Sequence, residues 1–179
     1  MELGVYRWTK KDKWLYILSM LPLAVLYVGT AYLLAAYSIY LLIILIALYV
    51  ITNIFQAGCC VGCPYRGNYC PALCGVYLGK ILSIILYKNR PFEPKFFKLN
   101  AKAAEIAVLV MAVYPLHWVF KSGWYLVPIY VLLIAAHFIL FMSTQCEKCS
   151  YSTTCPGGRA WQRCRKQFGG KERNVMADI

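Results

Sequence analysis

The residues best suited to chemistry in this sequence are its nine cysteines, which fall into two short segments. The first segment directly follows a long apolar run and contains Cys59, Cys60, Cys63, Cys70 and Cys74. The second directly follows the last apolar run and contains Cys146, Cys149, Cys155 and Cys164. Thiolates are soft metal ligands and redox groups. A functional hypothesis must therefore explain two grouped sets of thiols.

Metal ligation explains the grouping best. A tetrahedral thiolate site needs four sulfurs near one point, and a C-x2-C step brings two of them together. Each segment contains one such step, and the first also has two cysteines four positions apart, which would share one face of a helical turn. The predicted ligands are Cys60, Cys63, Cys70, Cys74, Cys146, Cys149, Cys155 and Cys164. Cys59 is left as an extra thiol, and both one shared site and two separate sites stay open.

Iron–sulfur clusters are the leading hypothesis for the metal, and zinc is the alternative. Cys63, Cys70 and Cys155 each precede a proline. This Cys-Pro step resembles that of bacterial ferredoxins, although their compact C-x2-C-x2-C-x3-C-P spacing is absent. A four-thiolate zinc site more often has two C-x2-C steps in one segment, and here each segment has one. Handling of a soft metal ion, or thiol redox chemistry, is a third hypothesis.

The composition indicates an integral membrane protein. Of the 179 residues, 61% are hydrophobic and 15% are charged, whereas soluble domains are about 45–50% apolar and about 25% charged. No charged residue occurs from Trp14 to Tyr65. A single helix of that length would be about 78 Å long, while a bilayer core needs about 30 Å, so the run must fold back on itself.

We predict an all-α fold with four transmembrane helices in two antiparallel hairpins. The spans are expected near 14–34, 37–56, 103–120 and 124–142, with a tight turn around 35–38. Residues 71–87 are apolar but carry Lys80 in the middle, which favours an interfacial helix over a fifth span. The predicted regions are a basic arm (1–13), the first hairpin (14–56), a cysteine-rich loop with the interfacial helix and a basic loop (57–102), the second hairpin (103–142) and a cysteine-rich tail (143–179).

The distribution of lysine and arginine predicts the orientation. With both termini and residues 57–102 on the cytoplasmic side of a plasma or inner membrane, every one of the 19 basic residues except Lys121 is cytoplasmic. Both cysteine segments then face the reducing cytosol, which disfavours structural disulfides. The net charge of +12 is explained by this topology, so we expect the bilayer, and no nucleic acid, as a partner. The oligomeric state stays open.

The only histidines, His117 and His137, lie in the last two predicted spans. Their expected depths differ by about 15 Å, which disfavours a shared haem. His137 is nevertheless a candidate for quinone or proton chemistry, because an ionisable residue inside a membrane is usually functional.

Together these features predict a membrane-anchored redox protein. Its cytoplasmic iron–sulfur clusters would transfer electrons between an acidic soluble partner and a membrane partner or quinone. A membrane scaffold stapled by zinc, without catalysis, is the alternative.

Overall fold

The computed structural model describes residues 9–61, 78–88, 90, 91, 93–144, 146 and 156–167. Within these residues every regular element is a helix: α1 (Lys10–Tyr37), α2 (Ile39–Cys59), α3 (Leu78–Tyr87), α4 (Pro94–Val113), α5 (Leu116–Ser122), α6 (Leu126–Thr144) and α7 (Pro156–Gln167). Four segments are long and apolar enough to cross a membrane, namely α1, α2, α6 and the continuous stretch Pro94–Ser122. The prediction of an all-α integral membrane protein with four spans is confirmed at this level.

Ser38 alone separates α1 from α2. Its backbone is extended, and its amide donates to the Leu34 carbonyl at 2.9 Å, which closes α1. Its hydroxyl accepts from the Tyr40 amide at 3.3 Å, which caps the start of α2. Because Ser38 both ends α1 and caps α2, the chain reverses direction at this residue, which lies within the predicted turn. The helices themselves extend beyond the predicted spans, since α1 begins at Lys10 and α2 continues to Cys59.

The basic loop expected in the last part of 57–102 is instead helical from Pro94 onward. Pro94 occupies the first turn of α4, where its missing N–H costs nothing because the first amides of a helix have no internal partner. The stretch Pro94–Ser122 has 29 residues, about 43 Å of helix, which exceeds a 30 Å hydrocarbon core. Its first turns, with the exposed Lys95 and Lys98, therefore extend into the headgroup region.

The shorter helices occupy the ends of the spans. α3 has 10 residues, about 15 Å, too short to cross a bilayer; the preceding residues 71–77 of the expected interfacial helix lie outside the described part. Pro115 separates α4 from α5, because it has no amide hydrogen to give to the Met111 carbonyl. α7 lies in the tail, where no helix was predicted.

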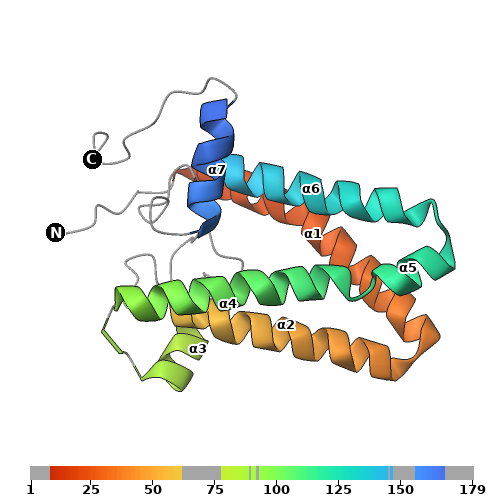
Figure 1. Cartoon of the computed structure of the whole chain (residues 1–179), viewed down its shortest axis with the longest axis horizontal. Helices are drawn as coiled ribbons and strands as arrows, with labels where there is room; N and C mark the ends of the chain where they lie inside the picture. The colour runs from red at the N-terminus through yellow and green to blue at the C-terminus, as the bar shows by residue number, and fades with distance from the viewer. Residues whose placement is uncertain are drawn as a thin grey trace.

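The spans pack mainly as two antiparallel pairs, α1 with α6 and α2 with α4 (Figure 1). Each pair joins one helix from each predicted hairpin, so the strongest packing runs between the hairpins. We call the end that holds α3, α7 and the start of α1 and α4 the basic end. We call the opposite end, with Ser38 and α5, the far end.

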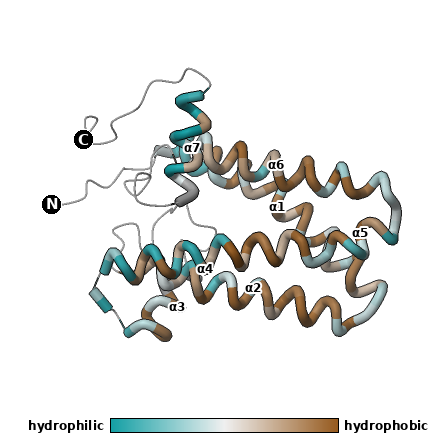
Figure 2. Tube along the Cα trace, viewed as in Figure 1, coloured by the Kyte–Doolittle hydropathy of each residue, from teal (hydrophilic) through white to brown (hydrophobic). Residues whose placement is uncertain are grey.

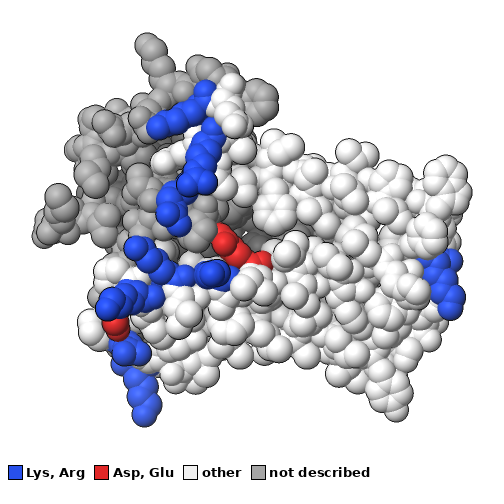
Figure 3. Space-filling model, viewed as in Figure 1, with Lys and Arg blue, Asp and Glu red and all other residues white. Residues whose placement is uncertain are grey.

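Charge and hydropathy divide along the same axis. Figure 2 shows hydrophobic residues along the spans and hydrophilic residues collected at the basic end. Large side chains such as Val28, Leu109 and Leu132 are more than 60% exposed, as expected of surfaces that face lipid. Lys121, in the last turn of α5, is the one lysine or arginine at the far end among the described residues, and Figure 3 shows basic atoms at that end only as a small isolated patch.

Candidate functional site

The end of α2 brings the first two cysteines to the basic end. Gly58 is buried and lies against Asn100 of α4 so closely that a side chain at this position would clash with it. Cys59 is the last residue of α2 and is half-buried, while Cys60 is buried and caps the helix with its amide. The close approach of α4 thus fixes the point at which the cysteine segment leaves the bundle.

α3 returns beside this point. The Tyr87 hydroxyl donates to the Ile54 carbonyl of α2 at 3.2 Å, and the Tyr87 ring stacks edge-on against Phe96 of α4. Burial, and to a smaller extent the nearby Cys59 thiol, raise the pKa of the Tyr87 phenol. Tyr87 therefore remains a neutral hydrogen-bond donor that attaches α3 to the end of α2.

The second cysteine segment starts at the same end. Cys146 follows the end of α6 at Thr144 and is half-buried, and Cys164 is exposed on α7. α7 packs against α6. Because α2 and α6 both run toward the basic end, the four described cysteines all lie there (Figure 1).

The structure describes only some of the predicted metal ligands. Cys60, Cys146 and Cys164 are described, as is the extra thiol Cys59. Among the described residues no group of three potential ligands is close enough to hold a metal ion. The remaining predicted ligands lie outside the described residues; they are Cys63, Cys70, Cys74, Cys149 and Cys155.

Exposed cations lie at the same end of the bundle as the described cysteines. Lys95, Lys98 and Lys102 lie at helical spacing along the first half of α4, and α7 carries exposed Arg159 and Arg163. Figure 3 shows these helices contributing a broad basic surface at one end of the molecule. Such a surface favours anionic partners, whether a thiolate cluster, lipid headgroups or an acidic protein.

His137 is the most unusual polar residue inside a span. Its side chain is 2% exposed, and its Nδ1 lies 2.8 Å from the Ser19 carbonyl oxygen of α1. A carbonyl oxygen only accepts hydrogen bonds, so Nδ1 carries a hydrogen and Nε2 is the bare nitrogen of the neutral ring. Nε2 is buried and has no hydrogen-bond partner in the described part of the chain. A buried group in this state costs about 1–3 kcal/mol, and such groups usually have a function or a water partner.

Two residues of α1 help to explain why the Ser19 carbonyl accepts the hydrogen bond from His137. Pro22 lies inside α1 and cannot donate to the Leu18 carbonyl, which loosens the backbone beside Ser19. The Ser19 hydroxyl donates to the Tyr16 carbonyl at 2.7 Å and leaves the Ser19 carbonyl to His137. Pro22 is the sequence feature that could have pointed to this part of α1. The contact itself could not be predicted, because 118 residues separate Ser19 from His137.

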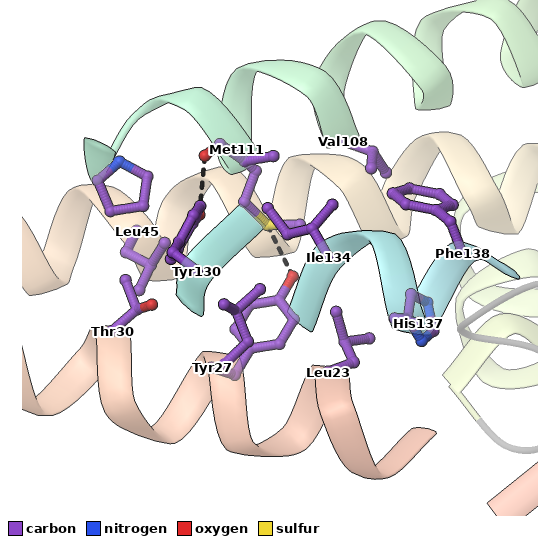
Figure 4. Close-up of a pocket in the computed structure, with 13 residues that line it drawn as sticks. Leu23, Tyr27, Thr30, Leu45, Val108, Met111, Tyr130, Ile134, His137 and Phe138 are labelled. Atoms are coloured by element: carbon purple, nitrogen blue, oxygen red, sulfur yellow. Dashed lines mark hydrogen bonds between the residues drawn. The ribbon is translucent and has the colours of Figure 1, made fainter. Parts of the chain in front are cut away.

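A cavity of about 50 Å³ is lined by residues of α1, α4 and α6 together with Leu45 of α2, and His137 is part of this lining. Figure 4 shows Tyr27 of α1 reaching toward Met111 of α4, where its hydroxyl donates to the sulfur at 2.8 Å. The Tyr130 hydroxyl of α6 donates to the Ala112 carbonyl at 2.7 Å. This bond satisfies a carbonyl close to the break at Pro115.

The other histidine is far from this site. His117 is exposed on α5, at the far end, where its ring stacks edge-on against Trp118. His137 lies in the half of α6 nearer the basic end. The two residues are not brought together, in agreement with the depth argument against a shared haem.

Comparison with known proteins gives no information on the function of this chain. Neither protein families, nor curated proteins, nor solved structures yielded a match to this chain.

Proposed function

We propose that the chain is a membrane-anchored redox protein that binds iron–sulfur at the basic end of its helical bundle. The proposed ligands are drawn from both cysteine segments; they are Cys60, Cys63, Cys70, Cys74, Cys146, Cys149, Cys155 and Cys164. Bound there, the cluster would supply one-electron transfer between a soluble donor and a membrane partner or quinone.

The observation that carries this proposal is the return of both cysteine segments to one end of the bundle. α2 delivers Cys60, and α6 delivers Cys146, from two different helix pairs. Soft thiolates gathered without histidine are the donor set that iron–sulfur clusters use. The buried position of Cys60 also suits a ligand, since burial limits access of solvent to the metal.

The charge at this end supports the same proposal. A cluster held by four thiolates is anionic, and exposed lysines and arginines of α4 and α7 lie at the same end of the bundle as the described cysteines. The same cations would attract an acidic donor protein and speed its association. Their excess at this end also favours its placement in the cytoplasm, where thiols stay reduced.

Metal and acid-labile sulfide analysis tests the proposal. The full chain, purified anaerobically in detergent, is expected to contain about four irons and four sulfides per cluster, with broad visible absorption that bleaches on reduction. Stoichiometric zinc without sulfide would overturn the redox function. Absence of any stoichiometric metal would overturn it too, and would leave thiol redox chemistry or transient handling of a soft metal ion.

A zinc-stapled scaffold is the second candidate, and the pairing of the helices favours it. The first cysteine segment belongs to the α2–α4 pair and the second to the α1–α6 pair. One four-thiolate zinc shared between the segments would tie these pairs together at the basic end. Zinc removal by a chelator is then expected to lower the unfolding temperature, whereas an electron-transfer cluster would also show a reduction potential.

A further inference from the structure

We propose that one face of α4 binds an anionic phospholipid of the bilayer. The lipid phosphate lies between lysine side chains, and an acyl chain lies along the apolar side chains that follow them. We call this face the α4 stripe; it consists of Lys95, Lys98, Lys102, Ile106, Leu109 and Val113. The inference goes beyond the proposed metal chemistry and does not depend on which metal, if any, the cysteines hold.

The α4 stripe is a single uncovered face of the helix. Its six residues follow one another at steps of three or four, which places their side chains in one row along an α-helix, and all six are exposed. The opposite face of α4, which packs mainly against α2, holds the buried residues; they are Phe97, Asn100, Ala101, Ala104 and Met111. The stripe therefore faces the surroundings of the bundle.

The two halves of the stripe match the two parts of a phospholipid. Lys102 and Lys121 are 19 residues apart, about 28.5 Å along a helix, which is close to the thickness of about 30 Å of a hydrocarbon core. Because Lys121 marks the far surface, Lys102 lies near the level at which the opposite headgroups begin. Ile106, Leu109 and Val113 are 55%, 64% and 55% exposed and lie within the core. Figure 2 shows the same change along α4, from hydrophilic at the basic end to hydrophobic beyond it.

The lysines of the stripe are available to a phosphate. Lys98 and Lys102 are four residues apart, so their ammonium groups can reach the same anion, and Lys95 lies one turn further out. None of the three forms an ion pair with a carboxylate of the described residues. Glu105 is exposed at the edge of the stripe, one turn deeper than Lys102, and its charge would repel a phosphate from that depth. The headgroup is therefore expected between Lys98 and Lys102.

A lipid fits the α4 stripe better than a soluble acidic protein does. A soluble partner could contact the lysines but could not follow the stripe into the hydrocarbon core, where only lipid chains or another span can cover it. α7 provides the contrast. Its Arg159 and Arg163 are also exposed and four residues apart, but α7 lies across the axis of the bundle (Figure 1). Its one large apolar side chain, Trp161, is half-buried, so no exposed apolar row continues from these arginines.

Native mass spectrometry tests the proposal on the full chain in detergent micelles that contain equal amounts of phosphatidylglycerol and phosphatidylcholine with identical acyl chains. The chain is expected to retain one phosphatidylglycerol and to prefer it over phosphatidylcholine by about fivefold or more, because basic residues at the membrane surface attract anionic headgroups. Equal retention of the two lipids would overturn the proposal.

Two double variants locate the bound lipid. Lys98→Gln with Lys102→Gln removes two charges from the α4 stripe, and Arg159→Gln with Arg163→Gln removes two charges from α7 at the same end of the bundle. Exposed substitutions of this kind change stability little. The α4 variant is expected to lose most of the preference for phosphatidylglycerol, whereas the α7 variant should keep most of it. Equal loss in both variants would show that the overall charge of the basic end attracts the lipid, and it would overturn the α4 site.

A soluble acidic probe separates the lipid from a protein partner. Polyglutamate is added to the wild-type chain and to both double variants in phosphatidylcholine micelles, and its binding is measured in the same way. If the α4 variant keeps its preference for phosphatidylglycerol but no longer binds polyglutamate, the lysines dock an acidic protein and the proposal is wrong. Loss of the lipid preference with polyglutamate binding retained supports the lipid site.

Discussion

The two halves of the bundle differ in what they bury. Toward the far end, Leu34, Leu45 and Met111 form an apolar core, and partly buried aromatic and aliphatic side chains pack around it. Toward the basic end, buried apolar residues such as Ala57 and Phe97 are mixed with eight buried polar side chains; these are Asp12, Ser19, Thr52, Asn53, Gln56, Ser83, Asn100 and His137. Thr30 is the one buried polar side chain of the far half among the described residues. One half is built as a packed core, whereas the other carries hydrogen-bonding groups deep into the bundle.

The apolar half therefore contributes mainly to stability, whereas the half with buried polar groups contains the candidate functional residues. Polar groups in a membrane interior are costly unless they are hydrogen-bonded, and several of these bond within their own helix. Asn53, for example, donates to the Tyr49 carbonyl at 2.7 Å, and Asn100 to the Phe96 carbonyl at 2.9 Å. These bonds satisfy part of the hydrogen-bonding capacity of the two amides within their own helices. The described cysteines and His137 all belong to this half.

The largest expected effect is loss of metal on Cys60→Ser. Serine replaces a soft thiolate by a hydroxyl that does not ionise at neutral pH, so the site lacks one of four ligands. We expect at least half of the bound metal per chain to be lost, as measured by elemental analysis of the purified protein.

Cys59→Ser is the matched control for this variant. Cys59 is adjacent in sequence but was left over when the ligands were assigned, so its replacement should leave the metal content unchanged. Loss of metal from Cys59→Ser with retention by Cys60→Ser would show that the ligands had been assigned wrongly at the end of α2.

The next largest effect is expected in the apolar half, on Leu34→Ala. The Leu34 side chain is fully buried, and truncation leaves a cavity. Buried leucine truncations cost about 2–5 kcal/mol; we expect about 2–3 kcal/mol, because burial from lipid lacks a hydrophobic driving force and the loss is one of packing. Unfolding by a denaturing detergent in mixed micelles measures the change. Metal content per folded chain should stay constant; a parallel loss of metal would show that the halves are coupled.

The sequence predicted the division into spans better than it predicted the polar half. Long charge-free runs determine the number of spans because a bilayer excludes charge over a fixed thickness, and Ser38 lies within the predicted turn. The start of α4 was missed because Pro94 among lysines suggests a loop, although proline is also favoured in a first helical turn. Contacts between distant residues carry no local signal, so neither the Gly58–Asn100 approach nor the bond from His137 to Ser19 could be predicted.

Gly58→Ala tests whether close packing of α2 on α4 positions the cysteine segment. The added methyl group would clash with the Asn100 side chain, and overpacking of this kind costs about 1–3 kcal/mol. The same detergent unfolding experiment measures the loss, and metal content should fall with it because Cys60 is displaced.

Gly29→Ala is the control for added volume on a helical glycine. A methyl group at Gly29 of α1 meets nothing within 4 Å, so it should be neutral or should stabilise the protein, since alanine favours helix over glycine by about 1 kcal/mol. If Gly29→Ala and Gly58→Ala destabilise the protein equally, the close contact between α2 and α4 at Gly58 does not account for the effect.

The smallest effect is expected on Tyr130→Phe, in the far half of the bundle. The variant keeps the ring and removes the hydroxyl that donates to the Ala112 carbonyl at 2.7 Å. Hydrogen bonds between transmembrane helices contribute about 0.6 kcal/mol on average, and we expect a loss of about 0.5–1 kcal/mol, because the break at Pro115 leaves this carbonyl few other donors. A Tyr125→Phe variant is the control, since Tyr125 is 57% exposed and its hydroxyl should contribute little. If Tyr130→Phe is as silent as Tyr125→Phe, the bond from Tyr130 to the Ala112 carbonyl adds nothing to stability, and the apolar half is held by packing alone.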